Sequence, residues 1–175
     1  MEELGYYSMA FHPYDKSFWN RDIGYSGMGF NVFYSDIDFQ NKEMCHGYIS
    51  DMSLTKEIIE RFEAQKSVHP EQPIFSFAVS VQNHVSSMSG MDEASEKEGC
   101  TGITTKVIGK EIEKEISEDV EEHYNGMRET IRALEALMNY FEEYEEDTVI
   151  VFFGDHAPGF VKGVCDTEGR ETEIN

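Results

Sequence analysis

The side chains best suited to chemistry follow an apolar run near the end of the chain. The run TVIVFF at residues 148–153 is typical of a buried parallel strand, and GDHAPG follows it directly. Ligands of open α/β sheets bind beyond the carboxyl ends of the strands, so Asp155 and His156 are expected at the functional edge. A carboxylate and an imidazole suit Mn²⁺, Mg²⁺ or Zn²⁺. The pair is therefore a candidate metal site, and a turn followed by a helix cap is the alternative explanation.

Four more side chains are suited to handling a phosphate group. Arg21 can grip a phosphate through a bidentate fork. His12 and His84 can donate hydrogen bonds to phosphoryl oxygens or protonate a leaving alkoxide. Trp19 offers a flat apolar wall and an indole donor. Each residue type also has an ordinary structural use, such as a tryptophan in a core or a histidine on a solvated loop, so their combination matters more than any one of them.

The elements that must position these side chains are predicted to be strands alternating with helices. Aromatic and β-branched residues are dense in four segments, which predicts strands at 5–11, 30–34, 74–81 and 148–153. The last two segments are expected to be neighbouring or near-neighbouring strands of one mostly parallel sheet, with a long helix packed on its face.

Two helices are predicted to cover that sheet. Residues 53–66 place apolar side chains at helical spacing after Ser53, the expected N-cap, and Asp51 is interpreted as a further capping residue. Residues 117–146 repeat apolar side chains every three or four positions, as a long amphipathic helix does. The stretch 85–116 is predicted to be a long loop that ends in a helix start. A long helix followed by an apolar strand indicates an α/β fold.

The composition restricts the partners of the chain. Its 175 residues suit one domain, and 35 acidic against 14 basic residues give a formal net charge of −21. This balance argues against binding nucleic acid and against docking onto anionic lipid through this surface, and it is compatible with cation binding. No run of about 18 apolar residues occurs, so a membrane anchor is expected only outside these residues.

The cysteines argue against a zinc site built on thiolates. Cys45, Cys100 and Cys165 form no CxxC pair, and their odd number argues against a full disulfide framework. One bridge remains an open alternative.

Four separated motifs together resemble one known family. GYYSMAFHPYDKSFWNRDIGYSGMGFNVFY, GYISD, FSFAVSVQNH and TVIVFFGDHAPG follow one another in the order found in lipoteichoic acid synthases. These are phosphoglycerol transferases of the alkaline phosphatase and sulfatase superfamily. The resemblance covers most of the chain apart from 85–116 and the carboxyl-terminal end. It implies that residues 1–175 form a partial sulfatase-like catalytic domain, an incomplete αβα sandwich with a mostly parallel central sheet.

The resemblance also implies a role for each matching residue. Asp155 and His156 match two ligands of one divalent cation, typically Mn²⁺, with Mg²⁺ or Zn²⁺ as alternatives. His84 matches a histidine that contacts the phosphate, and it is the candidate catalytic residue within this chain. Four residues match or lie near the pocket for the glycerophosphate head group: His12, Asp15, Trp19 and Arg21.

The function implied by the resemblance is the transfer of glycerophosphate from a phosphatidylglycerol-type lipid to a glycerophosphate polymer or glycolipid acceptor. The family's nucleophilic threonine and a glutamate ligand correspond to positions before Gly5, so the chain is expected to be an incomplete piece that is inactive alone. Its parent is expected to be anchored at the extracytoplasmic face of a bacterial cell membrane.

Two alternatives stay open. One is a sulfatase or phosphodiesterase hydrolase of the same superfamily, although none of the cysteines has the context of a formylglycine motif. The other is a non-catalytic binding domain that retains the fold.

Overall fold

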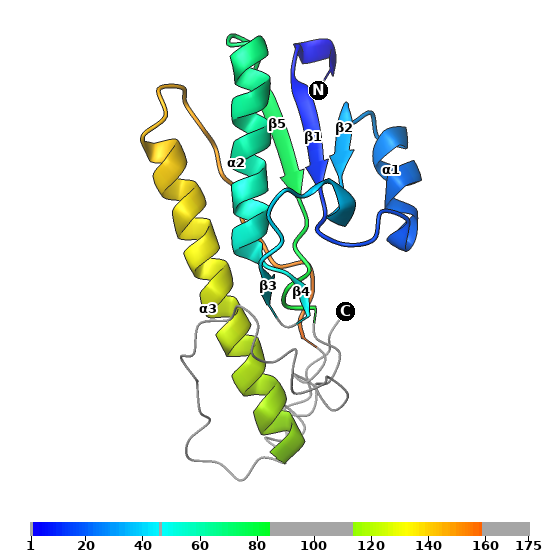
Figure 1. Ribbon diagram of the computed structural model, residues 1–175, viewed down its shortest axis with the longest axis vertical. Helices are drawn as coiled ribbons and strands as arrows, with labels where there is room; N and C mark the ends of the chain where they lie inside the picture. Colours follow the sequence, from blue (N-terminus) through cyan, green and yellow to red (C-terminus); the bar gives the residue numbers. More distant parts are fainter. Residues whose placement is uncertain (1, 46, 85–113, 159–175) are drawn as a thin grey trace.

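The computed structural model describes residues 2–45, 47–84 and 114–158, and a three-stranded parallel sheet lies at their centre (Figure 1). The order across the sheet is β2 (Val32–Tyr34), β1 (Tyr7–Phe11) and β5 (Ile74–Ala78). These strands confirm the predictions for 5–11, 30–34 and 74–81 with shorter bounds. Helices and parallel strands alternate along the chain, so the predicted α/β class is also confirmed.

The pairing register decides which side chains face which layer. Met9 of β1 lies opposite Val32 on one side and Ser76 on the other, and its neighbour Ala10 lies opposite Phe33 and Phe77. Paired residues point to the same face of a sheet, and successive residues alternate between faces. Met9 and Ala10 therefore belong to two different cores.

One face of the sheet is covered by α2 (Asp51–Val68), on which α3 (Lys114–Glu142) packs. Leu54 and Ile58 of α2 form one buried apolar cluster with Met9 and Phe11 of β1. Leu137 of α3 packs against the same cluster. The helices predicted at 53–66 and 117–146 are thus confirmed, and both begin slightly earlier than the sequence indicates.

The opposite face of the sheet is covered by α1 (Arg21–Gly27). Tyr25 is its buried residue, and the ring lies 4.8 Å from that of Phe33 and 6.1 Å from that of Phe77. Both phenylalanines lie on the Ala10 face of the sheet. Helices thus cover both faces, in agreement with the expected αβα arrangement. The described residues also form 3₁₀ turns at Glu2–Leu4, Phe18–Asn20 and Asp36–Asp38.

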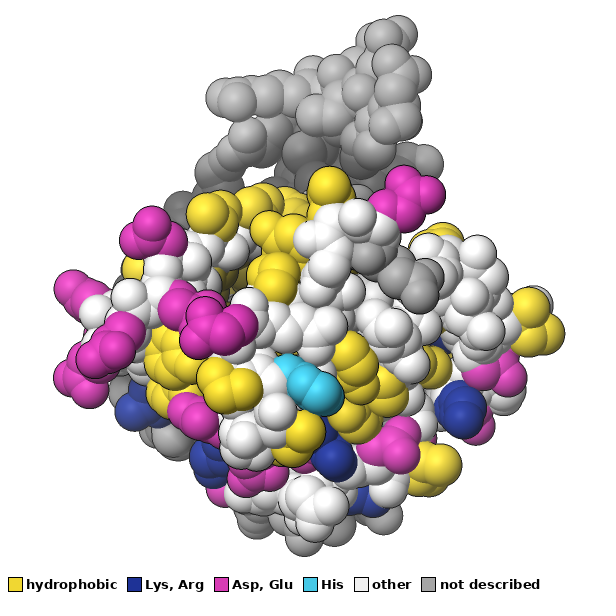
Figure 2. Space-filling view, turned by 90° about the horizontal axis from the view of Figure 1, so that it is seen from above, with side chains coloured by type: hydrophobic (Ala, Val, Ile, Leu, Met, Phe, Trp, Pro, Cys, Tyr) yellow, Lys and Arg dark blue, Asp and Glu magenta, His cyan; other side chains and the backbone are white. Residues whose placement is uncertain are grey.

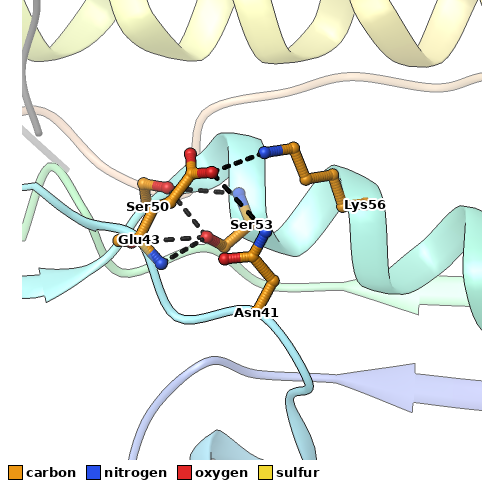
Figure 3. Close-up of polar contacts among 5 residues, drawn as sticks. All are labelled: Asn41, Glu43, Ser50, Ser53 and Lys56. Atoms are coloured by element: carbon orange, nitrogen blue, oxygen red, sulfur yellow. Dashed lines mark hydrogen bonds and ion pairs between the residues drawn. The ribbon is translucent and has the colours of Figure 1, made fainter.

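A polar network fixes the start of α2 next to the small hairpin of β3 (Met44–Cys45) and β4 (Tyr48–Ile49). Ser50 is the N-cap, and its hydroxyl oxygen accepts from the Ser53 amide at 3.1 Å (Figure 3). The Ser53 hydroxyl binds the backbone of Glu43, whose carboxylate binds Lys56 at 2.7 Å. The sequence predicted Ser53 as the N-cap, and this prediction is wrong, because α2 begins two residues before Ser53.

The prediction of a strand at 148–153 is wrong. The segment forms no strand, and five of its apolar side chains are exposed, up to 87% for Val149: Val149, Ile150, Val151, Phe152 and Phe153. A strand exists only through the ladder that it makes with a partner, and β5 makes its ladder with β1 alone among the described residues. Figure 1 shows the segment running from the end of α3 toward the end of the molecule where the strands finish.

Two further expectations can be compared with the structure. Cys45 is disulfide-bonded, whereas Cys100, Cys165 and most of the stretch predicted as a loop, residues 85–113, lie outside the described residues. Among the helices that the structure describes, none is long and apolar enough to cross a membrane.

Charge is distributed unevenly over the surface. Figure 2 looks onto the amino ends of the strands, where acidic side chains gather on the side of α2 and α3 and the Lys and Arg side chains lie scattered. This face agrees with the net charge of −21 and presents no continuous basic patch among its described residues.

Ser50→Ala should lower the free energy of unfolding by about 1 kcal/mol, because it removes the acceptor for the Ser53 amide. Urea unfolding followed by circular dichroism measures this. Ser67→Ala is the matched control, since Ser67 is exposed near the other end of α2, and its effect should stay within about 0.5 kcal/mol. Equal losses in the two variants would contradict the assignment of Ser50 as the cap.

Candidate functional site

His12 lies at the carboxyl end of β1 and is held from both neighbouring strands. Its backbone amide donates to the carbonyl of Tyr34 at 2.9 Å, and its side chain is almost fully buried, with 2% exposed. Nδ1 lies 2.8 Å from the carbonyl oxygen of Val79, and Nε2 lies 2.9 Å from Nη1 of Arg21. A guanidinium only donates and a carbonyl only accepts. The imidazole is therefore neutral, with the proton on Nδ1 and Nε2 accepting from Arg21.

The surroundings of His12 preserve this neutral form. Burial lowers the pKa of His12, and the charges of Arg21 and His84 lower it further, while the hydrogen bond to Val79 and the charge of Asp36 oppose them. A neutral acceptor next to a guanidinium orients the guanidinium without cancelling its charge. The remaining donors of Arg21 stay available for an anion at the edge of the sheet.

His84 reaches the same edge from the chain that follows β5. Its backbone amide donates to the carbonyl of Val81 at 2.8 Å, which closes a turn over residues 81–84. The imidazole is exposed, and its ring centroid lies 6.3 Å from that of His156 in an edge-to-face arrangement. The structure thus brings His84 next to His156 of the GDH segment, which lies 72 residues later in the chain (156 − 84).

Asp155 and His156 are arranged so that two ligand atoms face each other. His156 Nδ1 lies 3.0 Å from the carbonyl of Ala157 and donates to it, which leaves the lone pair on Nε2 free. Nε2 lies 3.6 Å from Oδ2 of Asp155. Two ligands bound to one cation at about 2.1 Å each are separated by roughly 3–3.5 Å, so the donor set fits a divalent ion. Both side chains are exposed, which leaves room for further ligands.

The two residues supply only part of a coordination shell. The described residues contain no group of three or more His, Cys, Asp or Glu side chains gathered in the manner of metal ligands. Structural and catalytic zinc sites use three or four protein ligands, so these two alone hold an ion weakly.

Trp19 stands out on the surface next to the site. Its side chain is 79% exposed, and Trp19 and Asn20 both have left-handed backbones, with φ of 59° and 53°. Such a conformation costs of order 1–3 kcal/mol for each non-glycine residue and is concentrated at functional sites. The ring contacts that of Phe18 at 6.1 Å.

Asp15 is turned toward its own loop. Oδ1 accepts from the amide and the hydroxyl of Ser17, both at 2.7 Å, and these bonds lower the pKa of Asp15. Within the described residues the carboxylate thus orders the turn before Trp19. Its proposed place in the head-group pocket gains no support from these contacts.

A buried polar network behind His84 was not found by sequence reasoning. Asp51 does not cap α2 as expected, because its carboxylate accepts from the hydroxyl of Thr130 on α3 at 2.5 Å. Asn83 also donates to Thr130, at 2.8 Å, and the amide of Asp51 donates to Gln82 at 2.9 Å. The two adjacent amides directly after a predicted strand were the one signal in the sequence.

The comparisons with known proteins agree with this fold. The family model described as Sulfatase matches residues 1–173, so the chain belongs to the sulfatase family. Members of the alkaline phosphatase and sulfatase superfamily commonly use divalent metal ions.

Two curated relatives extend the comparison. A Rhizobium meliloti protein named for cyclic beta-1,2-glucan modification is 33% identical over 91% of this chain and 24% of its own length. Lipoteichoic acid synthase 1 of Bacillus subtilis is 29% identical over 97% of this chain and 23% of its own length. The chain thus spans about a quarter of the length of these relatives.

Solved structures share the fold. The lipoteichoic acid synthase LtaP from Listeria monocytogenes matches with a TM-score of 0.59 and 18% identity, over 81% of this chain and 31% of that one. The Streptococcus pyogenes phosphoglycerol transferase GacH, solved with sn-glycerol-1-phosphate, matches with a TM-score of 0.59 and 19% identity, over 81% of this chain and 34% of that one. Both confirm the predicted α/β fold.

Asp51→Asn should weaken the dependence of stability on pH. Burial raises the pKa of Asp51 in spite of the hydrogen bond from Thr130, so the folded protein binds this proton more tightly than the unfolded chain does. Folding then takes up a proton, and the free energy of unfolding falls as the pH rises above about 4 toward the raised pKa. Urea unfolding between pH 4 and 7 should show a smaller fall in the variant.

Asp15→Asn serves as a control of opposite sign. Because hydrogen bonds from Ser17 lower the pKa of Asp15, its contribution to stability is lost as the pH falls rather than as it rises. A pH dependence of Asp51→Asn equal to that of the wild type would show that the Asp51 carboxyl ionises normally in the folded protein.

Proposed function

We propose that this chain is part of a membrane-anchored, metal-dependent phosphoglycerol transferase that acts on a phosphatidylglycerol-type lipid at the extracytoplasmic face. The observation that carries the proposal is that His12 and His84 follow the carboxyl ends of the neighbouring parallel strands β1 and β5. The paired His12 and Arg21 provide an oriented cation, and His84 lies beside the Asp155–His156 pair. A phosphodiester needs both, an anion grip and a site for a cation.

Arg21 is the residue that binds the phosphate in this scheme. Nη1 is held by Nε2 of His12, and the buried imidazole keeps the guanidinium plane in one orientation. The outward donors can then take two phosphoryl oxygens at once. His12 thus acts by positioning Arg21, because neither of its ring nitrogens is left to bind substrate.

His84 is proposed to serve the leaving group. In the first step the alkoxide of a threonine upstream of Gly5 attacks phosphorus, and the bond from phosphorus to the diacylglycerol oxygen breaks. That oxygen takes up a proton, for which the exposed imidazole of His84 is the candidate donor. In the second step an acceptor hydroxyl attacks phosphorus and gives its proton back to His84, and the bond from phosphorus to the threonine oxygen breaks, which restores the threonine alkoxide.

Asp155 and His156 would hold a divalent cation, with Mn²⁺ as the first candidate. A bound cation lowers the pKa of a nucleophile and neutralises charge on the transferring phosphoryl group. Within this chain, the bond from His156 Nδ1 to Ala157 orients the imidazole for that task. Trp19 would provide an exposed wall for the glycerol carbons.

The acceptor has two candidates. A glycerophosphate polymer or glycolipid follows from the likeness to Lipoteichoic acid synthase 1. A glucan is the second candidate, because a 33% identical relative is named for cyclic beta-1,2-glucan modification. In both cases the attacking group is a sugar or glycerol hydroxyl, so the same donor site serves either acceptor.

Asp155→Ala and His156→Ala should each abolish release of the head group by the full-length parent protein. Each substitution removes one of two ligand atoms that lie 3.6 Å apart. The assay follows a head-group-labelled phosphatidylglycerol with Mn²⁺, with acceptor arms of glycerophosphate polymer, cyclic β-1,2-glucan and water alone. The isolated 175-residue chain should bind Mn²⁺ weakly and show no turnover.

His69→Ala is the matched control, because His69 follows the far end of α2, and it should leave turnover unchanged. Turnover with water alone at the full rate would indicate a hydrolase instead of a transferase. Binding of the lipid without turnover in any arm would favour a binding domain. Unchanged turnover in both Asp155→Ala and His156→Ala would show that GDH is only a turn.

Arg21→Lys should lower kcat/KM by roughly 10- to 100-fold in the same assay. Lysine keeps the positive charge, but its ammonium group lacks the planar fork that lets Arg21 bind His12 and two phosphoryl oxygens at the same time. Arg128→Lys, on the exposed surface of α3, is the control and should have no effect. Equal activity of Arg21→Lys and wild type would remove Arg21 from the phosphate site.

A further inference from the structure

The turn that carries His84 is anchored by the side chains of its two central residues. Gln82 is fully buried, with 0% exposed, Asn83 is half-buried, and His84 emerges exposed directly after them. The His84 amide closes the turn on the carbonyl of Val81 at 2.8 Å. The position of the His84 imidazole on the surface therefore depends on the groups that bind the side-chain amides of Gln82 and Asn83.

Asn83 is held through a hydroxyl relay. Its Nδ2 donates to Oγ1 of Thr130 at 2.8 Å, and Thr130 Oγ1 donates to Oδ2 of Asp51 at 2.5 Å. A hydroxyl has one proton, so its use toward the carboxylate leaves the oxygen to accept from the asparagine. Thr130 Oγ1 also lies 3.2 Å from the carbonyl oxygen of Gly126, and its shorter bond goes to Asp51, which is buried at the first turn of α2.

The side chain of Gln82 forms hydrogen bonds with the same two helices, α2 and α3. Its Oε1 accepts from the backbone amide of Asp51 at 2.9 Å, and its Nε2 donates to the carbonyl of Gly126 at 3.3 Å. Gly126 is one helical turn before Thr130 on α3. The two amides of the turn are therefore clamped between α2 and α3 by a closed ring of hydrogen bonds.

We propose that Thr130 and Asp51 are positioning residues for His84, which set the imidazole at the site by clamping Asn83. The proposal rests on the function proposed above, in which His84 serves the leaving group. Neither residue touches the substrate in this scheme. Within the described part of the chain, the His84 ring contacts the ring of His156, and the turn over residues 81–84 decides where the imidazole lies.

The test is a series of substitutions in the full-length parent protein. Thr130→Val keeps the shape but can neither accept from Asn83 nor donate to Asp51. It should lower kcat by about 10- to 100-fold with less than about a threefold change in KM. A misplaced His84 imidazole would stabilise the transition state less and would leave substrate binding nearly unchanged. Thr130→Ser keeps the relay and should retain wild-type kcat.

Thr55→Val is the matched control. The Thr55 hydroxyl also bridges α2 and α3, donating to the carbonyl of Ala133 at 3.2 Å, and it lies outside the relay. It should reduce the melting temperature about as much as Thr130→Val does, yet leave kcat unchanged. Equal losses of kcat in Thr55→Val and Thr130→Val would overturn the proposal, because they would show that only general stability matters.

A double-mutant cycle tests whether Thr130 acts through His84. In a His84→Ala background, Thr130→Val should change kcat by less than about twofold, since the group that it positions is gone. Independent, multiplicative losses would overturn the proposal.

A second readout separates this proposal from the proposed function. If the wild-type parent shows no turnover, the proposed function fails, and the imidazole resonance of His84 in histidine-labelled, metal-free protein decides the positioning. His84→Asn assigns the resonance. Thr130→Val should shift or broaden it, whereas Thr130→Ser and Thr55→Val should not. A His84 resonance unchanged in Thr130→Val would overturn the positioning proposal.

Discussion

The parallel pairing of β1 with β2 on one side and β5 on the other is the constraint on which the rest of the structure depends. Because all three strands point the same way, their carboxyl ends meet at one edge. The ladder continues one step beyond the strands, where His12 donates to Tyr34 and Phe11 accepts from Val79. The backbone and side chain of His12 are therefore held by the segments on both sides of β1, and His12 orients Arg21 through a hydrogen bond.

Burial then decides the chemistry that this fixed frame can perform. A buried imidazole with a lowered pKa is a neutral acceptor, so Arg21 keeps its full charge in a protein whose net charge is −21. An oriented cation in an acidic chain is a local attraction for an anion. Burial also shapes the network behind His84, where the buried carboxyl of Asp51 binds the hydroxyl of Thr130.

The two helices on one face of the sheet thus have more than one task. Their apolar side chains build the core with Met9 and Phe11, and their polar side chains hold the turn before His84. A change in how α3 packs on α2 would therefore move Thr130 and, with it, the turn that carries His84. This coupling follows from the hydrogen bonds and requires no movement of the sheet.

The sequence by itself determined the elements with strong local patterns and the motifs beside them. β1, β2, β5, α2 and α3 were predictable, and His12 and His84 could be expected at one edge, because strand direction decides where the following residues lie. The tertiary structure decided what depends on distant partners. Residues 148–153 are apolar but form no strand, since a strand requires a ladder with a neighbour. Asp51 binds Thr130, 79 residues later, instead of capping its own helix. Local sequence carries no signal for such a bond, because its partner is brought near only when α3 packs on α2.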